Sequence, residues 1–223
     1  MKIEIWSDVM CPFCYIGKRK FEAALDQLKD KKDIEIEWKS FQLSPDMTTN
    51  PDKNIHQYLA EHKGISLEEA KKMNNYVTEM AKNVGLDYHF EKAIVANSMM
   101  AHRFLHFSKT KYKQNEAEEL LFKSYFTDGK NTDDLDTLID LGKQLELDVL
   151  ELTKVLKSNE FENDVKADIQ EAQELGINGV PFFVFDRKYA ISGAQETELF
   201  INTLQTAYQE WEMDNSQNRV NLN

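Results

Sequence analysis

Residues 1–14 read MKIEIWSDVMCPFC, and this stretch decides the fold. Apolar and polar side chains alternate over its first six residues, which is the pattern of a strand with one buried face. From Cys14 onward the apolar positions recur at helical spacing, through Phe21 to Leu28. Cys11 and Cys14 therefore lie where a predicted strand meets a predicted helix.

Cys11 and Cys14 are the two cysteines of the chain, and their places on the predicted helix differ. Pro12 suits a first helical turn, because its missing N–H would have no partner there. Cys11 is thus expected at the helix N-terminus, where the helix dipole and free N–H groups favour a thiolate. Cys14 falls on the apolar face and is expected to be shielded. Dithiol exchange needs an exposed attacking thiol and a sheltered partner, so we predict that Cys11 attacks and Cys14 resolves the mixed disulfide.

Zinc binding and plain packing are two other readings of the cysteine pair. A zinc site needs four ligands, commonly two pairs of cysteine or histidine residues, and the chain has no second cysteine pair. His102 and His106 are four residues apart on a predicted helix and could in principle complete a site. The strand–helix setting favours redox chemistry over both readings, and we expect no metal.

Composition and charge narrow the class of protein. The 223 residues are 41% hydrophobic, and 39 acidic against 27 basic residues give a net charge of −12. This acidic balance argues against nucleic acid or an anionic membrane as partner. The N-terminus lacks the pattern of a secretory signal, and the longest uncharged apolar stretch, 93–101, is far shorter than a membrane span. We expect a cytoplasmic protein, and because stable disulfides are rare in that compartment, a catalytic pair is favoured.

Three zones follow one another along the chain. Residues 1–49 read as strand, helix and strand, residues 50–176 are helical in pattern throughout, and residues 177–213 return to two strands and a closing helix. Neither outer zone has enough strands for a stable sheet alone. We therefore predict one discontinuous α/β domain, 1–49 with 177–213, that carries an all-helical insertion at 50–176. Residues 214–223 are polar and are expected to form a frayed tail.

Several short segments resemble the DsbA-like thiol–disulfide oxidoreductases, and within them the FrnE-like branch. That branch is related to 2-hydroxychromene-2-carboxylate isomerases and kappa-class glutathione transferases. The resemblance implies a thioredoxin fold with a large helical insertion and a cis bond between Val180 and Pro181. The segments that carry it are 11–15, 97–98, 101–103, 179–182 and 191–195.

The resemblance also implies roles for residues around the pair. Pro181 would lie beside the cysteines as part of the catalytic site, and the backbone of Val180 would bind extended substrate like an added strand. Apart from the resemblance, we expect Pro12 and Phe13, next to the thiols, to contact substrate. Asn97, Ser98 and His102 are candidates to line the groove opposite the cysteines. The other reading of His102 is a hydrogen-bonded packing residue.

Two departures from the family pattern bear on the chemistry. DsbA itself has histidine at the place of Phe13, and a histidine there helps to stabilise the thiolate, so we expect a weaker oxidant. The isomerase and transferase relatives generally carry serine in place of the attacking cysteine. This chain keeps both Cys11 and Cys14, which favours exchange of an electron pair over glutathione addition.

Glu37 and Lys39 lie on one face of the second predicted strand and are candidates to move the proton of the resolving thiol. The alternative is that both are solvated surface charges. Asp8, three residues before Cys11, is expected either to influence its titration or to cap the turn.

The sequence thus predicts a thiol–disulfide oxidoreductase acting on a thiol- or disulfide-containing protein or small molecule. It would need no organic cofactor, with glutathione as a candidate co-substrate, and would be a monomer or homodimer. Two alternatives are a glutathione-dependent transferase or isomerase and a non-catalytic module that binds peptides or unfolded chains.

Overall fold

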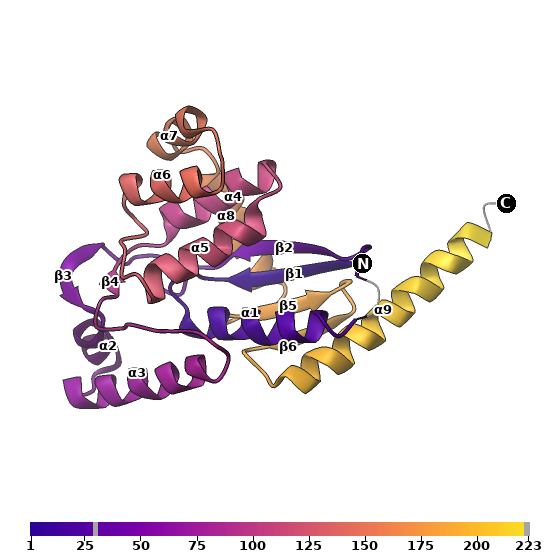
Figure 1. Cartoon of the computed structure of the whole chain (residues 1–223), viewed down its shortest axis with the longest axis horizontal. Coiled ribbons are helices and arrows are strands. Elements are labelled where there is room, and N and C mark those ends of the chain that lie inside the picture. Colours follow the sequence, from indigo (N-terminus) through magenta and orange to yellow (C-terminus); the bar gives the residue numbers. More distant parts are fainter. Residues whose placement is uncertain (29–30, 221–223) are drawn as a thin grey trace.

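The computed structural model describes residues 1–28 and 31–220 (Figure 1). Its main sheet has the strand order β2-β1-β5-β6, in which β1 and β2 are parallel and the other two pairs are antiparallel. The two outer zones of the sequence thus meet in one sheet, and the predicted α/β fold with an insertion is confirmed. The strands are β1 (Lys2–Ser7), β2 (Glu35–Ser40), β5 (Phe182–Phe185) and β6 (Tyr189–Ser192).

The two faces of the sheet are covered by different helices because side chains alternate along each strand. Ile3 and Ile5 of β1 face the apolar sides of α1 (Pro12–Leu25) and α9 (Thr197–Val220). Trp6, the residue after Ile5, points to the other face and packs against α8 (Glu162–Glu174). The sheet therefore forms the middle of three layers.

The inserted segment joins β2 to β5 and lies beyond the β2 edge and the carboxyl end of β1 (Figure 1). We predicted an all-helical insertion, and this prediction is wrong, because β3 and β4 pair into a small antiparallel sheet. The sequence of β3 is polar throughout and β4 has only two residues, so neither leaves an alternating pattern to detect. Its elements are β3 (Asn50–Asn54), α2 (Ile55–Lys63), α3 (Leu67–Lys82), β4 (Ile94–Val95), α4 (Met99–Thr110), α5 (Gln114–Phe126), α6 (Leu135–Gln144), α7 (Val149–Lys157) and α8.

The position of α8 changes the predicted boundary at residue 176. Sequence spacing placed α8 with the insertion, but Trp6 Nε1 donates to the Asp168 carbonyl at 3.0 Å, and the Asp168 carboxylate accepts from the backbone N–H of Ser40 at 2.9 Å. Because α8 is bonded to both parallel strands, it belongs to the layer that covers the sheet.

The chain end also differs from the prediction of a frayed tail at 214–223. Helix α9 continues to Val220, and residues 221–223 lie outside the described part. Beyond Trp211 the helix is held by polar contacts, since Lys188 of the β5–β6 hairpin forms a 2.6 Å ion pair with Asp214. Among the described residues, no helix has the length and hydropathy to cross a membrane.

Candidate active site

Cys11 is the N-cap residue of α1, and Pro12 is the first residue of the helix. The backbone N–H of Cys11 donates to the Asp8 carbonyl at 2.9 Å, which fixes the turn between β1 and α1. The thiol therefore lies at the positive end of the helix dipole, as predicted. Its exposure was predicted wrongly: Cys11 is only 3% exposed, because the loop before β5 covers it.

Cys14 lies one turn further along α1 and is fully buried, as predicted. Its side chain contacts Cys11, the hydroxyl of Ser7 and the backbone N–H of Asp8. Burial and the neighbouring Cys11 raise the pKa of the Cys14 thiol well above its ordinary value of about 9, although the Ser7 and Asp8 contacts oppose this. Cys14 is therefore a neutral thiol near neutral pH. The two cysteines are not joined by a disulfide.

The loop before β5 completes the surroundings of the pair. The Val180–Pro181 peptide bond is cis, and the Cys11 thiol donates to the Val180 carbonyl at 3.5 Å. A side chain at Gly17 would prevent this arrangement, since a Cβ there would lie 3.0 Å from Cγ of Pro181. Val180 and Pro181 therefore lie beside the cysteines, as the resemblance implied.

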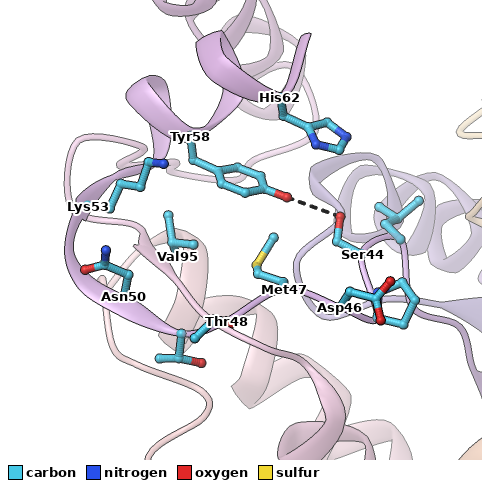
Figure 2. A pocket seen from close by; sticks show the side chains of 12 residues that line it. Ser44, Asp46, Met47, Thr48, Asn50, Lys53, Tyr58, His62 and Val95 are labelled. Atoms are coloured by element: carbon cyan, nitrogen blue, oxygen red, sulfur yellow. Dashed lines mark hydrogen bonds between the residues drawn. The ribbon is translucent and has the colours of Figure 1, made fainter.

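One cavity opens beside the N-terminus of α1, and a second cavity adjoins it. The smaller one, about 330 Å³, reaches Met10 and Pro12 and is bounded on its far side by Tyr125 of α5. The larger one, about 620 Å³, lies between the loop after β2 and the elements β3, α2 and β4. In Figure 2 the hydroxyl of Tyr58 points across it and donates to Ser44 at 3.3 Å. Residues common to both cavities are Leu43, Ser44, Met47, Tyr58 and His62.

Pro12 and Phe13 both lie where a substrate of Cys11 would pass. Pro12 lines the smaller cavity. Phe13 lies between the two cysteines in the sequence and is 39% exposed, so it presents apolar surface next to the pair. The predicted contact of these two residues with substrate is compatible with these positions.

Asn97 braces the loop that borders the cavities, and the structure does not support the predicted contact with substrate. Its Nδ2 donates to the carbonyls of Pro45 at 3.1 Å and Met47 at 2.8 Å. Its Oδ1 accepts from the Gln42 amide at 3.2 Å and from the Met99 N–H at 2.8 Å. These four bonds use the whole hydrogen-bonding capacity of an asparagine side chain.

His102 is also directed inward, and the prediction that it contacts substrate needs correction. It is 1% exposed and does not line either cavity beside α1. Its Nε2 lies 3.6 Å from Oδ1 of Asp8, beyond hydrogen-bond distance. Asp8 itself caps the turn, because its Oδ2 accepts from the Leu43 N–H at 2.7 Å.

Glu37 and Lys39 are not placed to exchange a proton with the cysteines. Lys39 pairs in register with Trp6 and forms a 3.0 Å ion pair with Asp168, so both side chains point to the α8 face of the sheet. Glu37 is held on that face by Lys2 and Lys109. The Ser7 side chain, next along β1, points to the opposite face. The strand pattern was read correctly, but it could not indicate which face the cysteines occupy.

Ser7 and Glu118 are the residues of this site that the sequence analysis missed. The Ser7 hydroxyl donates to Oε1 of Glu118 at 2.8 Å, below the cysteine pair. A signal was present, since Glu118 shares its helix face with Leu121, Phe122 and Tyr125, and an acidic residue in such an apolar stripe is unusual.

No group of three or more metal-ligating side chains occurs in 1–28 and 31–220. His106 is engaged elsewhere, since its Nε2 lies 3.1 Å from both Oγ of Ser40 and Oδ2 of Asp168. The zinc reading of the cysteine pair therefore lacks a ligand set in the described part of the chain.

Comparison with known proteins connects this geometry to a family. Residues 2–205 match the DSBA-like thioredoxin domain. The crystal structure of a probable DsbA oxidoreductase, SCO1869 from Streptomyces coelicolor, is 33% identical with a TM-score of 0.88, and the match covers 94% of this chain and 91% of that one. The uncharacterized protein YwbO of Bacillus subtilis is 27% identical over 89% of this chain and 92% of its own length.

More distant structures share the fold. The cytosolic disulfide reductase DsbM from Pseudomonas aeruginosa has a TM-score of 0.66 at 12% identity, over 94% of this chain and 99% of its own. A 2-hydroxychromene-2-carboxylate isomerase has a TM-score of 0.67 at 16% identity, over 97% of this chain and 98% of its own. The thioredoxin fold with its insertion is thereby confirmed, as is the predicted likeness to both groups.

Proposed function

Because this chain belongs to the family of DSBA-like thioredoxin domains, we propose that it is a thiol–disulfide oxidoreductase whose exchanging pair is Cys11 and Cys14. The observation that carries the proposal is the unequal setting of the two thiols. Cys11 caps a helix, contacts the Val180 loop and lies between Met10 and Pro12, which line a cavity, whereas Cys14 is fully enclosed and contacts Cys11. One thiol can meet a substrate, and the other can reach only its partner.

In the reducing direction the Cys11 thiolate attacks one sulfur of a substrate disulfide. The substrate S–S bond breaks, one substrate sulfur leaves as a thiolate with the bonding pair, and Cys11 becomes a mixed disulfide. Cys14 then loses its proton and attacks the Cys11 sulfur, which releases the second substrate thiolate and leaves a Cys11–Cys14 disulfide. The reverse sequence oxidises a dithiol. The electron pair resides in the cysteines, so the exchange needs no organic cofactor or metal.

The surroundings of Cys11 suggest the kind of substrate. The smaller cavity places Met10 and Pro12 next to the pair, and the exposed Phe13 adds apolar surface. We propose a protein or small-molecule thiol or disulfide with an apolar group next to its sulfur, bound by the backbone of Val180, and glutathione as a candidate co-substrate. In the cytoplasm, where we place the protein, a reducing thiol pool would drive it as a reductase or isomerase.

Trapping with Cys14→Ala tests the proposal. The variant is expected to accumulate mixed disulfides on Cys11 from cell extract, because no resolving thiol remains, and mass spectrometry after non-reducing separation would identify the attached chains. The wild type is expected to reduce insulin disulfides with dithiothreitol as electron donor. The double variant Cys11→Ala/Cys14→Ala is the matched control and should trap nothing. An inactive wild type together with an empty trap would overturn the proposal.

A further inference from the structure

A buried carboxyl group lies beneath the cysteine pair and has no part in the exchange described above. Glu118 of α5 is 1% exposed. Its Oε1 accepts the hydrogen bond from Ser7, and its Oε2 has no hydrogen-bond partner in the described part of the chain. A buried polar atom without a partner costs free energy, so this position calls for an explanation beyond packing.

Ser7 connects this carboxyl group to the resolving thiol. Ser7 is the last residue of β1 and is 2% exposed. Its hydroxyl contacts the Cys14 thiol on one side and donates to Glu118 at 2.8 Å on the other. A hydroxyl can accept one hydrogen bond while it donates another, so Ser7 is placed to relay a proton from Cys14 to Glu118.

The resolving thiol needs such a path. Cys14 must be a thiolate to attack the mixed disulfide, but burial raises its pKa well above 9, so it rarely ionises unaided near neutral pH. Solvent cannot serve as the base, because Cys14 is completely enclosed. A proton acceptor within the protein is therefore required.

The surroundings of Glu118 give its carboxyl group a pKa suited to accepting the proton of Cys14. Burial raises the pKa of Glu118 to about 7, while the Ser7 hydrogen bond and the neighbouring His102 on α4 and Lys18 on α1 oppose the increase. Asp8 at the end of β1 adds a smaller increase. A base that titrates near 7 can both accept and return a proton at neutral pH.

We propose that Glu118, acting through Ser7, accepts the proton of Cys14 when Cys14 attacks the mixed disulfide, and returns it when the pair is reduced again. The Ser7 hydroxyl gives its proton to Oε1 of Glu118 and takes the proton of Cys14. The Cys14 thiolate then forms the bond to the Cys11 sulfur, and the substrate thiolate leaves with the electron pair. Glu118 stays protonated while the pair is oxidised. This role rests on the proposed dithiol exchange.

The two steps of exchange can be observed separately with dithiobis(nitrobenzoate), a disulfide whose released thiolate is coloured. Attack by Cys11 releases the first coloured thiolate, and resolution by Cys14 releases the second. In the wild type the second step should become faster as pH rises, with a midpoint near 7, because Glu118 must be ionised to accept the proton. Glu118→Gln should slow the second step about 100-fold at pH 8, abolish that midpoint, and leave the first step unchanged.

Thermal unfolding separates this role from a structural one. Because the pKa of Glu118 in the folded protein lies above its unfolded value of about 4.5, ionised Glu118 costs stability as pH rises through 7. Glu118→Gln keeps the shape and an acceptor for Ser7, so it should unfold at the same or a higher temperature at pH 8. A purely structural carboxylate would show the opposite, a lowered unfolding temperature.

Glu119→Gln is the matched control, since Glu119 is the next residue of α5, is 30% exposed and pairs with Lys18 and Arg19 instead of Ser7. It should leave both steps unchanged. Ser7→Ala interrupts the path at its middle and should slow the second step as Glu118→Gln does. An unchanged second step in Ser7→Ala or Glu118→Gln, or an equal loss in Glu119→Gln, would overturn the role of Glu118 while dithiol exchange stands. A wild type that releases only one thiolate would overturn dithiol exchange itself.

Discussion

Cys11→Ser is expected to lose all disulfide reductase activity. A serine hydroxyl at the N-cap of α1 can keep the turn, but it cannot form a mixed disulfide, and Cys14 is too enclosed to attack substrate in its place. The measurement is insulin reduction by the wild type and the variant at equal concentration, with far-ultraviolet circular dichroism to show that both are folded. The expected rate for the variant is that of the reaction without enzyme.

The same variant distinguishes dithiol exchange from the two alternative functions. Glutathione conjugation does not need the Cys11 thiol to form a mixed disulfide, so conjugation of an electrophile that persists in Cys11→Ser would favour a transferase. A module that binds unfolded chains without catalysis should keep its cellular activity in Cys11→Ala. Loss of both insulin reduction and cellular activity would favour the oxidoreductase over both alternatives.

Asp168→Ala is expected to destabilise the fold by about 3 kcal/mol, which for a chain of this size lowers the unfolding temperature by roughly 6–12 °C. The Asp168 carboxylate accepts from Lys39 Nζ at 3.0 Å and from the backbone N–H of Ser40, and it contacts His106 on α4. Its removal leaves these donors on β2 and α4 without their shared acceptor. Urea unfolding at pH 7 measures the loss directly.

The effect of Asp168→Ala should depend on pH with a defined sign. Burial would raise the pKa of Asp168, but the bond to His106, the Ser40 N–H and the charge of Lys39 outweigh it and hold the pKa below its usual 3.8. The stabilising contribution is thus present above about pH 4 and lost as pH falls through the lower folded-state pKa. The difference between wild type and variant should therefore shrink from pH 7 to pH 3.

Glu171→Ala is the matched control for Asp168→Ala. Glu171 also pairs with Lys39, at 3.2 Å, from the next turn of α8, but it is 31% exposed. A pair open to solvent contributes about 1 kcal/mol or less, so this variant should unfold close to the wild type. Equal destabilisation by the two variants would contradict the account given for Asp168.

Local patterns were sufficient for most of the architecture. The capping box of Ser66 and Glu69 begins α3, and Asp148 caps α7 by accepting from the N–H groups of Leu150 and Glu151. Periodicity identified the strands of the main sheet and the insertion between them. It did not detect β3, which is polar, or β4, which has two residues, and it assigned α8 to the insertion. Neither such short strands nor the packing partner of a helix can be predicted from spacing.

What the sequence by itself determined is the position of the cysteine pair where a strand meets a helix. A strand pattern, then Cys11, Pro12 and Cys14, then a helical pattern places one thiol at a helix N-terminus and the other on the apolar face, and these are properties of neighbouring residues. Membership of the family could also be anticipated from short segments of the chain.

Only the tertiary structure decided which groups meet the pair. Glu37 and Lys39 follow the same strand rules as Ser7, yet they point to the α8 face, while Glu118 arrives from a helix 111 residues further along than Ser7. The pKa of a carboxyl group depends on its burial and on the charges within a few ångströms. Those surroundings are made by α1, α4, α5 and β1 together, and no local pattern of residues contains them.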